Sequence, residues 1–302
     1  MLIECGALSS WIPKLEDLFL KSFERLPPIG LLEWRYLRGA VDRTLFATEM
    51  RDGRIISSYS LSPQILSFNG DIFEAALSMT TMTHPNFQGQ GLFPKLAAEL
   101  YESVGKTFGF VYGFPNSRSH ASFSRKLDWA SVYEIPTMVI RNGRGELSSK
   151  VNKRTWIDLP IQEPPWLESL VHVSRSAGYV NWRFSSHPCN TYWIFTIEDS
   201  GWVVSYAVVK QFQDAWDLVD FVPHDLSHAE ELLAHVIGSA QSSGLTQINT
   251  WHPIHSPFRM LFEKFGFSNE GPVTYFGGRS LSGEIPQEWS TWFVQMSDSD
   301  VY

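Results

Sequence analysis

A long internal repeat constrains what this 302-residue chain can fold into. The tripeptide Trp34-Arg35-Tyr36 recurs 148 positions later as Trp182-Arg183-Phe184. The same offset relates further identical or similar residues: Thr48 and Thr196, Gly53 and Gly201, Ile55-Ile56 and Val203-Val204, Ser57 and Ser205. Beyond them an offset of 138 relates Pro85 to Pro223, Pro115 to Pro253 and Lys126 to Lys264. Ordered self-similarity indicates that one folding unit occurs twice, the second copy being shortened between Leu61 and Pro85; the alternative is two unrelated domains with similar hairpins.

Each copy of the repeat predicts a β-hairpin. The runs LFATEM and IISSYSL flank Asp52-Gly53, and YWIFTI and WVVSYAVV flank Ser200-Gly201. Runs rich in β-branched and aromatic residues around such a turn are typical of hairpins. The rest of the first copy predicts helices at 13–23, from 92 and at 119–126, and strands at 65–68, 74–83, 108–114 and 133–140. This order indicates an α+β fold.

The segment 141–156 is polar, contains glycine and lacks an apolar period, which is typical of a linker. We therefore expect two domains, residues 1–146 and residues 147–302, called the first and second half below. Each domain should be a mixed, mostly antiparallel sheet flanked by helices.

Charge and cysteine content exclude several classes of function. The 24 basic and 32 acidic residues are interspersed and give a formal net charge of −8, which argues against nucleic-acid and anionic-membrane binding. Cys5 and Cys189 form no disulfide or metal pattern, and the histidines show no ligand spacing, so no metal is expected. The N-terminal region lacks a signal pattern and no run is apolar enough to span a bilayer, which favours a cytoplasmic protein.

The segment TMTHPNFQGQGLFPKL predicts a strand, a turn with Gly89 and Gly91, and a helix start. Backbone amides at a helix start lack intrahelical partners and lie at the positive end of the helix dipole, so they can bind phosphate. The spacing is neither that of the nucleotide P-loop nor G-x-G-x-x-G. A tight strand-to-helix turn without a ligand is the alternative.

Two segments, HPNFQGQGLF and GFPNSRSHASFSRKLDW, resemble the signature regions of the GNAT superfamily of acyl-CoA N-acyltransferases. Gln88 and Gly91 match the pattern Q/R-x-x-G-x-G/A, whose last position is Phe93 here. Asn116 matches the second signature, and Gly266-Phe267 ends the corresponding helix of the second half as in the family. With the repeat, the chain resembles a tandem GNAT protein.

The resemblance implies a sheet that opens between its fourth and fifth strands, with acetyl-CoA or coenzyme A as co-substrate in the opening. The pyrophosphate would lie on amides of Gln88, Gly89, Gln90, Gly91, Leu92 and Phe93. Thr81, Met82 and Thr83 would line the fourth strand, and Asn116, or Ser117 if the match is aligned from the helix end, would reach the cofactor from the opposite side. Asp225, Glu230 and Glu231 occur at this loop in the second half and would repel a pyrophosphate, so only the first half should bind coenzyme A.

Acyl transfer by direct attack needs a neutral amine and a group that assists the leaving thiolate. In many GNAT enzymes the acid is a helix tyrosine, whose position falls on Phe123 or Ser124 here. The candidate catalytic residues are Glu74 as a base, Tyr112, and His120. Tyr133 and His84 are further substitutes, and the alternatives are core aromatics, a solvent-facing Glu74 and a chain of water molecules.

These observations predict an acyl-CoA-dependent N-acyltransferase that transfers acetyl to the amine of a small molecule. The alternative is a catalytically inactive acyl-CoA-binding protein of the same fold. An aminoacyl-transferring relative would need to bind tRNA, for which no basic patch is evident, and a third class is an interaction module without a cofactor.

Overall fold

The computed structural model describes residues 2–3, 10–38, 44–282 and 288–302, so Cys5 lies outside the described residues. The first half contains β1 (Leu2–Ile3), α1 (Ile12–Phe23), α2 (Leu31–Leu37), β2 (Leu45–Arg51), β3 (Arg54–Phe68), β4 (Asp71–Thr83), α3 (Leu92–Val104), β5 (Phe110–Gly113), α4 (His120–Lys126) and β6 (Ala130–Arg141). The second half contains β7 (Asn152–Arg154), β8 (His172–Val173), α5 (Ala177–Val180), β9 (Tyr192–Asp199), β10 (Trp202–Phe212), β11 (Ala215–Val222), α6 (Leu226–Ser242), β12 (Gln247–Trp251), α7 (Arg259–Phe265) and β13 (Ser268–Ser280).

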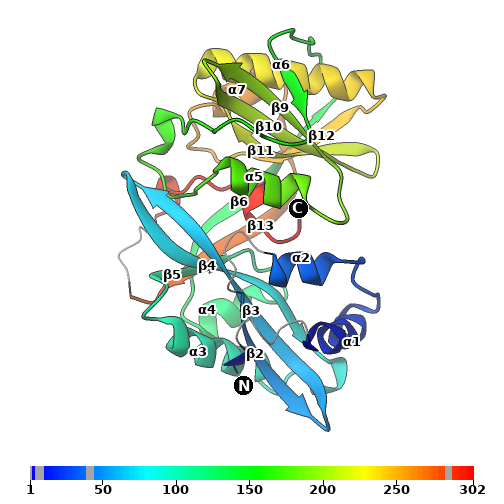
Figure 1. Cartoon of the computed structure of the whole chain (residues 1–302), viewed down its shortest axis with the longest axis vertical. Helices are drawn as coiled ribbons and strands as arrows, with labels where there is room; N and C mark the ends of the chain where they lie inside the picture. The colour runs from blue at the N-terminus through cyan, green and yellow to red at the C-terminus, as the bar shows by residue number, and fades with distance from the viewer. Residues whose placement is uncertain (1, 4–9, 39–43, 283–287) are drawn as a thin grey trace.

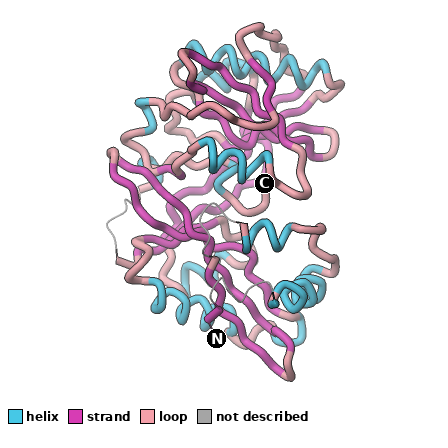
Figure 2. The backbone as a smooth tube through the Cα atoms, in the orientation of Figure 1, coloured by secondary structure: helices cyan, strands magenta, loops and turns pink. Residues whose placement is uncertain are grey.

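One sheet runs through both halves in the order β1-β2-β3-β4-β5-β13-β6-β12-β11-β10-β9-β7, with β8 paired to β3. The last strand of each half lies among strands of the other, because β13 pairs with β5 and β6 pairs with β12. In Figure 1, β6 and β13 pass through the middle of the molecule, between the lobe of β2–β5 and the lobe of β9–β12, and Figure 2 shows helices on the outside of both lobes. The predicted α+β fold with a mostly antiparallel sheet is confirmed.

The two copies of the repeat have the same local structure. Their elements follow one order, β2-β3-β4-α3-β5-α4-β6 and β9-β10-β11-α6-β12-α7-β13. Both hairpin turns have two residues with positive φ, 50° and 77° at Asp52-Gly53 and 49° and 82° at Ser200-Gly201, as a type I′ turn requires. The division into domains at residue 146 stays a prediction, since one sheet joins the halves.

The irregularities of the hairpins also coincide. The β2–β3 register shifts between Glu49 and Met50, opposite Ile56, and the β9–β10 register shifts around Val204, the repeat equivalent of Ile56. The equivalent residues Trp34 and Trp182 stack with ring centroids 5.1 Å apart, and Trp34 Nε1 donates to the Trp182 carbonyl at 3.1 Å. The repeated tripeptide therefore forms a contact between its two copies.

One predicted strand boundary is wrong. The strand expected at 65–68 is the end of β3, which runs without interruption from Arg54 and includes Pro63 opposite Ala76. Proline is usually confined to edge strands because it lacks an N–H, so the pattern indicated a break where the structure has none.

Helices cover the faces of the sheet with separate cores. On one face of the first half, α3 and α4 pack on Ala76, Val111 and Tyr59, whereas α1 and α2 pack on Met79 and Met82 from the opposite face. In the second half α6 and α7 pack on β9–β12. A fourth core lies between the halves and includes Tyr112, Phe276 and Trp292.

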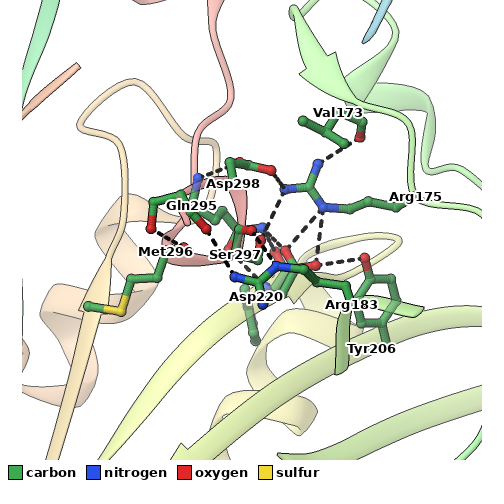
Figure 3. A network of polar contacts seen from close by, with 11 residues as sticks. Val173, Arg175, Arg183, Tyr206, Asp220, Gln295, Met296, Ser297 and Asp298 are labelled. Carbon is green, nitrogen blue, oxygen red and sulfur yellow. Dashed lines mark hydrogen bonds and ion pairs between the residues drawn. The ribbon is translucent and has the colours of Figure 1, made fainter. Parts of the chain in front are cut away.

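A buried ion network joins the segment 295–299 to Arg175 and to β11 (Figure 3). The Arg175 guanidinium bonds Asp220 at 3.1 Å and Asp298 at 2.7 Å, and Tyr206 donates to Asp220 at 3.0 Å. All of these groups are buried, and burial raises the pKa of Asp298 above its ordinary value despite the neighbouring Arg175. Removing one partner from a buried ion network leaves the other charge buried and unpaired, which strongly destabilises the folded state.

We predict that Arg175→Met lowers the free energy of unfolding by about 3–5 kcal/mol at pH 8, because it leaves two carboxylates buried without their cation. The loss should shrink as the pH falls through the raised pKa of Asp298, since protonation removes an unpaired charge. Denaturant unfolding at several pH values measures both effects. As a control, Arg154→Met breaks the partly exposed pair with Glu198 and should cost about 1 kcal/mol or less; equal losses for both variants would contradict the prediction.

Candidate functional site

The strands β4 and β5 form a fork. They pair in parallel over four rungs, from Ala75–Phe110 to Ser78–Gly113, and β5 ends at the last rung. β4 continues to Thr83 through a bulge, where its register with β3 shifts and Thr80 takes a φ of 45°. The backbone edge of β4 beyond Ser78 is therefore not paired with β5.

A glycine turn lies at the open end of the fork. Gly89 and Gly91 have φ values of 76° and 73°, in the left-handed region that favours glycine, and a Cβ at either would meet nothing within 4 Å. α3 begins at Leu92 with no side-chain cap, so its first-turn amides remain available to a ligand. Arg51 lies beside the turn, its guanidinium 4.9 Å from the centre of the Phe87 ring. The predicted strand, turn and helix start are confirmed.

The corresponding helix start of the second half is closed by its own chain. Asp225 is the N-cap of α6 and its carboxylate accepts the His228 amide at 2.9 Å. This hydrogen bond lowers the pKa of Asp225 below its ordinary value. The carboxylate occupies the place where an anion would bind, so the two copies differ in their chemistry at this point.

The residues of β4 and of the loop after β5 that were expected at the cofactor make contacts with neighbouring parts of the first half. Met82 is buried, and the Thr83 hydroxyl lies 2.9 Å from the Ser57 hydroxyl. Asn116 follows β5 across the fork, and its side-chain oxygen accepts the amides of Arg118 and Ser119 at 3.0 Å, which stabilises the turn before α4. Thr81, Thr83 and Asn116 therefore lie on the strand end and loop that border the opening, and their contact with a cofactor stays a prediction.

Two aromatic residues stand where the sequence departs from the family pattern. Phe93 packs with its ring centroid 4.9 Å from that of Phe123 and 5.6 Å from that of Tyr59. Phe123 is buried and packs on Trp129, whereas the Ser124 hydroxyl donates to the His120 carbonyl at 3.1 Å. Neither Phe123 nor Ser124 places a free hydroxyl at the fork.

The structure does not bring the three candidate catalytic side chains together. Glu74 is exposed near the start of β4, at the opposite end of the strand from the glycine turn. Tyr112 is buried among Phe276 and Trp292 on the face away from α3 and α4, and burial raises its pKa well above the ordinary value. His120 lies on α4 and stacks on Tyr275 of β13, with ring centroids 4.3 Å apart.

The two substitutes also have structural contacts. His84 Nδ1 accepts the Asn86 amide at 3.2 Å and so stabilises the turn before Gln88. The Tyr133 hydroxyl accepts the Ile254 amide at 3.4 Å. A role for any of these five residues in proton transfer stays a prediction.

The sequence reasoning missed a polar cluster at the bulge of β4. The Thr80 amide donates to Asp300 Oδ2 at 3.2 Å, and Arg35 bonds the Thr80 hydroxyl at 2.9 Å and pairs with Asp300 at 3.6 Å. A cavity of about 30 Å³ lies beside it, lined by Trp34, Arg35, Gln64, Met79, Trp182 and Asp300, among others. The repeated Trp-Arg dipeptide was a signal for this cluster, whereas nothing in the sequence placed Asp300 there.

Sequence and structure comparisons agree with this geometry. Residues 9–132, less than half of the chain, match the family model described as an acetyltransferase (GNAT) domain. That segment contains the fork, the glycine turn and α4. No curated protein sequence matches significantly.

Solved structures of three bacterial proteins are similar over most of the chain. A protein of Enterococcus faecalis V583, described as a probable N-acyltransferase, superposes with a TM-score of 0.71 at 14% identity, covering 93% of this chain and 73% of its own. GCN5-related N-acetyltransferases of Anabaena variabilis (TM-score 0.67, 11% identity, 93% and 73% covered) and Kribbella flavida (0.64, 14%, 93% and 71%) are also similar. The chain therefore shares their fold.

Within the described residues, no group of three His, Cys, Asp or Glu side chains is arranged to hold a metal ion. In the same part of the chain, every helix is too short or too polar to cross a bilayer. Cys189 is exposed and has a free thiol.

We predict that Asp225→Ala lowers the free energy of unfolding by about 1 kcal/mol, because α6 loses its N-cap. Asp225→Asn should keep most of the stability, since an amide oxygen also caps. The extra stability that the Asp225 carboxylate gives over Asn should be fully present above the ordinary pKa of aspartate. It should vanish as the pH falls through the lowered pKa that Asp225 has in the folded protein. Thermal unfolding of the three proteins between pH 2 and pH 7 tests this, and an unchanged midpoint for Asp225→Ala would contradict it.

Proposed function

We propose that this protein is an acyl-CoA-dependent N-acyltransferase that transfers acetyl from acetyl-CoA to the amine of a small molecule by direct attack. The observation that carries the proposal is the uncapped start of α3 behind two left-handed glycines, at the mouth of the β4–β5 fork. This arrangement lies within the segment that matches the GNAT domain.

The fork suits an elongated cofactor. A pyrophosphate at the turn would accept hydrogen bonds from amides between Gln88 and Phe93 and gain from the helix dipole, with the Arg51 cation nearby. A pantetheine arm would then extend along the open edge of β4 at Thr81–Thr83, whose backbone groups β5 does not use. Asn116 would border it from the other side.

We propose a tandem arrangement in which only the first half binds coenzyme A. The common order of elements and the matching hairpins support two copies of one unit. Asp225 closes the equivalent helix start with a negative charge, which disfavours a second pyrophosphate. The second half instead supplies β13 to the sheet beside β5.

The acceptor would enter from the face opposite α3, where the cavity beside Trp34, Arg35 and Asp300 reaches β4 at Met79. An alkyl ammonium must lose a proton before it attacks, at a cost of roughly 4–5 kcal/mol at neutral pH.

A catalytically inactive acyl-CoA-binding protein is the second candidate. The buried Phe123 at the position of the usual acid favours it, because this side chain has no proton to give. Both candidate proteins would bind coenzyme A at the same site, and only the acyltransferase would transfer the acyl group.

We predict that acetyl-CoA and coenzyme A bind in calorimetric titration, and that Gly91→Glu weakens binding more than tenfold because a carboxylate at the turn repels the pyrophosphate. Gly201→Glu is the matched control, since Gly201 has a φ of 82° and an equally open Cβ position at a distant turn. Both variants carry similar backbone strain, but only Gly91→Glu should lose the ligand. Absence of binding to the unmodified protein would refute the proposed function.

We further predict that a panel of primary amines contains one acceptor that releases free coenzyme A from acetyl-CoA, with a rate that rises with pH as the amine deprotonates. Detection of the free thiol measures the transfer. Tight cofactor binding without thiol release across amino sugars, amino-acid derivatives and polyamines would favour the inactive binding protein.

A further inference from the structure

A chain of four buried polar groups leads to the fork. Trp129 Nε1 donates to the Tyr101 hydroxyl at 3.1 Å, and the hydroxyls of Tyr101 and Tyr59 lie 2.7 Å apart. The Tyr59 hydroxyl in turn donates to Ser78 Oγ at 2.9 Å. Trp129 is the residue just before β6. Tyr101, Tyr59 and Ser78 belong to α3, β3 and β4 respectively.

The direction of these hydrogen bonds follows from the chemistry of tryptophan. An indole N–H can only donate, so the Tyr101 oxygen accepts it and the Tyr101 proton is directed to Tyr59. Tyr59 then donates to Ser78. The opposite direction would leave the Tyr101 proton without an acceptor among these groups. In the favoured direction, the Ser78 proton is the one that the chain leaves for another acceptor.

The position of Ser78 places that proton at the closed end of the fork. Ser78 is the last residue of β4 that pairs with β5, and its partner is Gly113. A Cβ at Gly113 would lie 3.2 Å from the Ser78 Cβ and 3.3 Å from the Trp129 ring, so glycine keeps the space beside Ser78 open. Ser78 is only 8% exposed, and no other acceptor for its hydroxyl lies among the described residues.

The spacing along β4 fits a reacting sulfur at this point. Five residue steps along β4 lead from Ser78 to Thr83, the residue nearest the glycine turn, a span of at most about 17 Å because the bulge at Thr80 shortens it. The pantetheine arm between the pyrophosphate and the sulfur of coenzyme A is a chain of comparable length. If the pyrophosphate lies at the turn, the sulfur reaches the region of Ser78.

We propose that the Ser78 hydroxyl donates a hydrogen bond to the sulfur of coenzyme A and stabilises the thiolate that leaves in acyl transfer, an inference that rests on the proposed function. The amine nitrogen forms a bond to the acyl carbon, and the C–S bond breaks with its electron pair on sulfur. The nitrogen loses one proton and the thiolate gains one through solvent, so Ser78 keeps its own proton. A hydrogen bond to an ionised group in a dry site is stronger than one between neutral groups.

Tyr59 and Tyr101 act as positioning residues in this arrangement. Burial raises the pKa of both hydroxyls above the ordinary value of tyrosine, so both stay protonated and keep donating. Their hydrogen bonds occupy the Ser78 oxygen as an acceptor, which directs its proton away from the core. Phe93 packs on Tyr59, and Phe123 packs on Phe93, so apolar rings surround the Tyr59 ring on this side.

The test measures the ionisation of bound coenzyme A and needs no acceptor. The thiolate absorbs in the ultraviolet, so a pH titration of the complex at saturating coenzyme A gives the thiol pKa. We expect a pKa below that of free coenzyme A, and Ser78→Ala should raise the bound value by about one unit, a tenfold change in the ionisation constant. Ser78→Thr, which retains a hydroxyl, should restore the low value, and Tyr59→Phe should give a smaller rise.

Calorimetry on the same variants separates the two proposals. Ser67→Ala, at a buried serine near the end of β3 where it pairs with β8, controls for the loss of a hydroxyl and should leave the thiol pKa unchanged. Coenzyme A binding with the same thiol pKa in Ser78→Ala and the unmodified protein would overturn the role of Ser78 and leave the proposed function intact. Failure of the unmodified protein to bind coenzyme A would overturn both.

Discussion

The fork between β4 and β5 depends on a strand from the other half of the chain. β5 has only four residues, and its two edges are paired with β4 in parallel and with β13 in antiparallel register. Without β13, β5 would be a very short edge strand with one free row of backbone groups. The segment that matches the GNAT domain ends at residue 132, near the start of β6, so it holds both arms of the fork but not the strand that supports β5. The second half therefore contributes to the candidate site because its strand β13 pairs with β5.

The two copies show how one fold supports different chemistry at equivalent positions. Their hairpin turns, register shifts and element order coincide, which reflects the same backbone requirements. At the helix start after the third strand they differ: Gly89 and Gly91 leave amides uncovered in the first copy, whereas Asp225 caps them in the second. A side-chain cap stabilises a helix and also takes the place of an external anion. Helix capping and anion binding compete for the same amides, and only the second copy uses a side-chain cap.

Local patterns predicted the hairpins, the glycine turn and the first turn of α3, because the residues that determine them are neighbours in sequence. The pairing of β13 with β5 and of β6 with β12 joins residues more than a hundred positions apart. A hydrophobic period shows that a segment is a strand, but it does not show which other strand that segment pairs with. For the same reason the hydroxyl chain could not be found, since Tyr59, Tyr101 and Trp129 meet only in the folded core. Tyr112 was expected near the opening, and the alternation of β5 directs its side chain to the opposite core from Val111.

Phe123 and the buried Ser78 belong to the same packed region of the first half. Phe123 has an apolar ring that packs on Phe93 and Trp129, so this helix position offers no hydroxyl and the surroundings are apolar. In such surroundings a neutral hydroxyl with a fixed direction interacts more strongly with a developing negative charge than it does in water. Serine is too weak an acid to give up its proton to a thiolate, so a donor of this kind can stabilise the leaving group only by hydrogen bonding. The need for a fixed direction explains why two protonated tyrosines stand behind it: an unanchored serine hydroxyl could rotate toward the strand carbonyls and leave the sulfur without a donor.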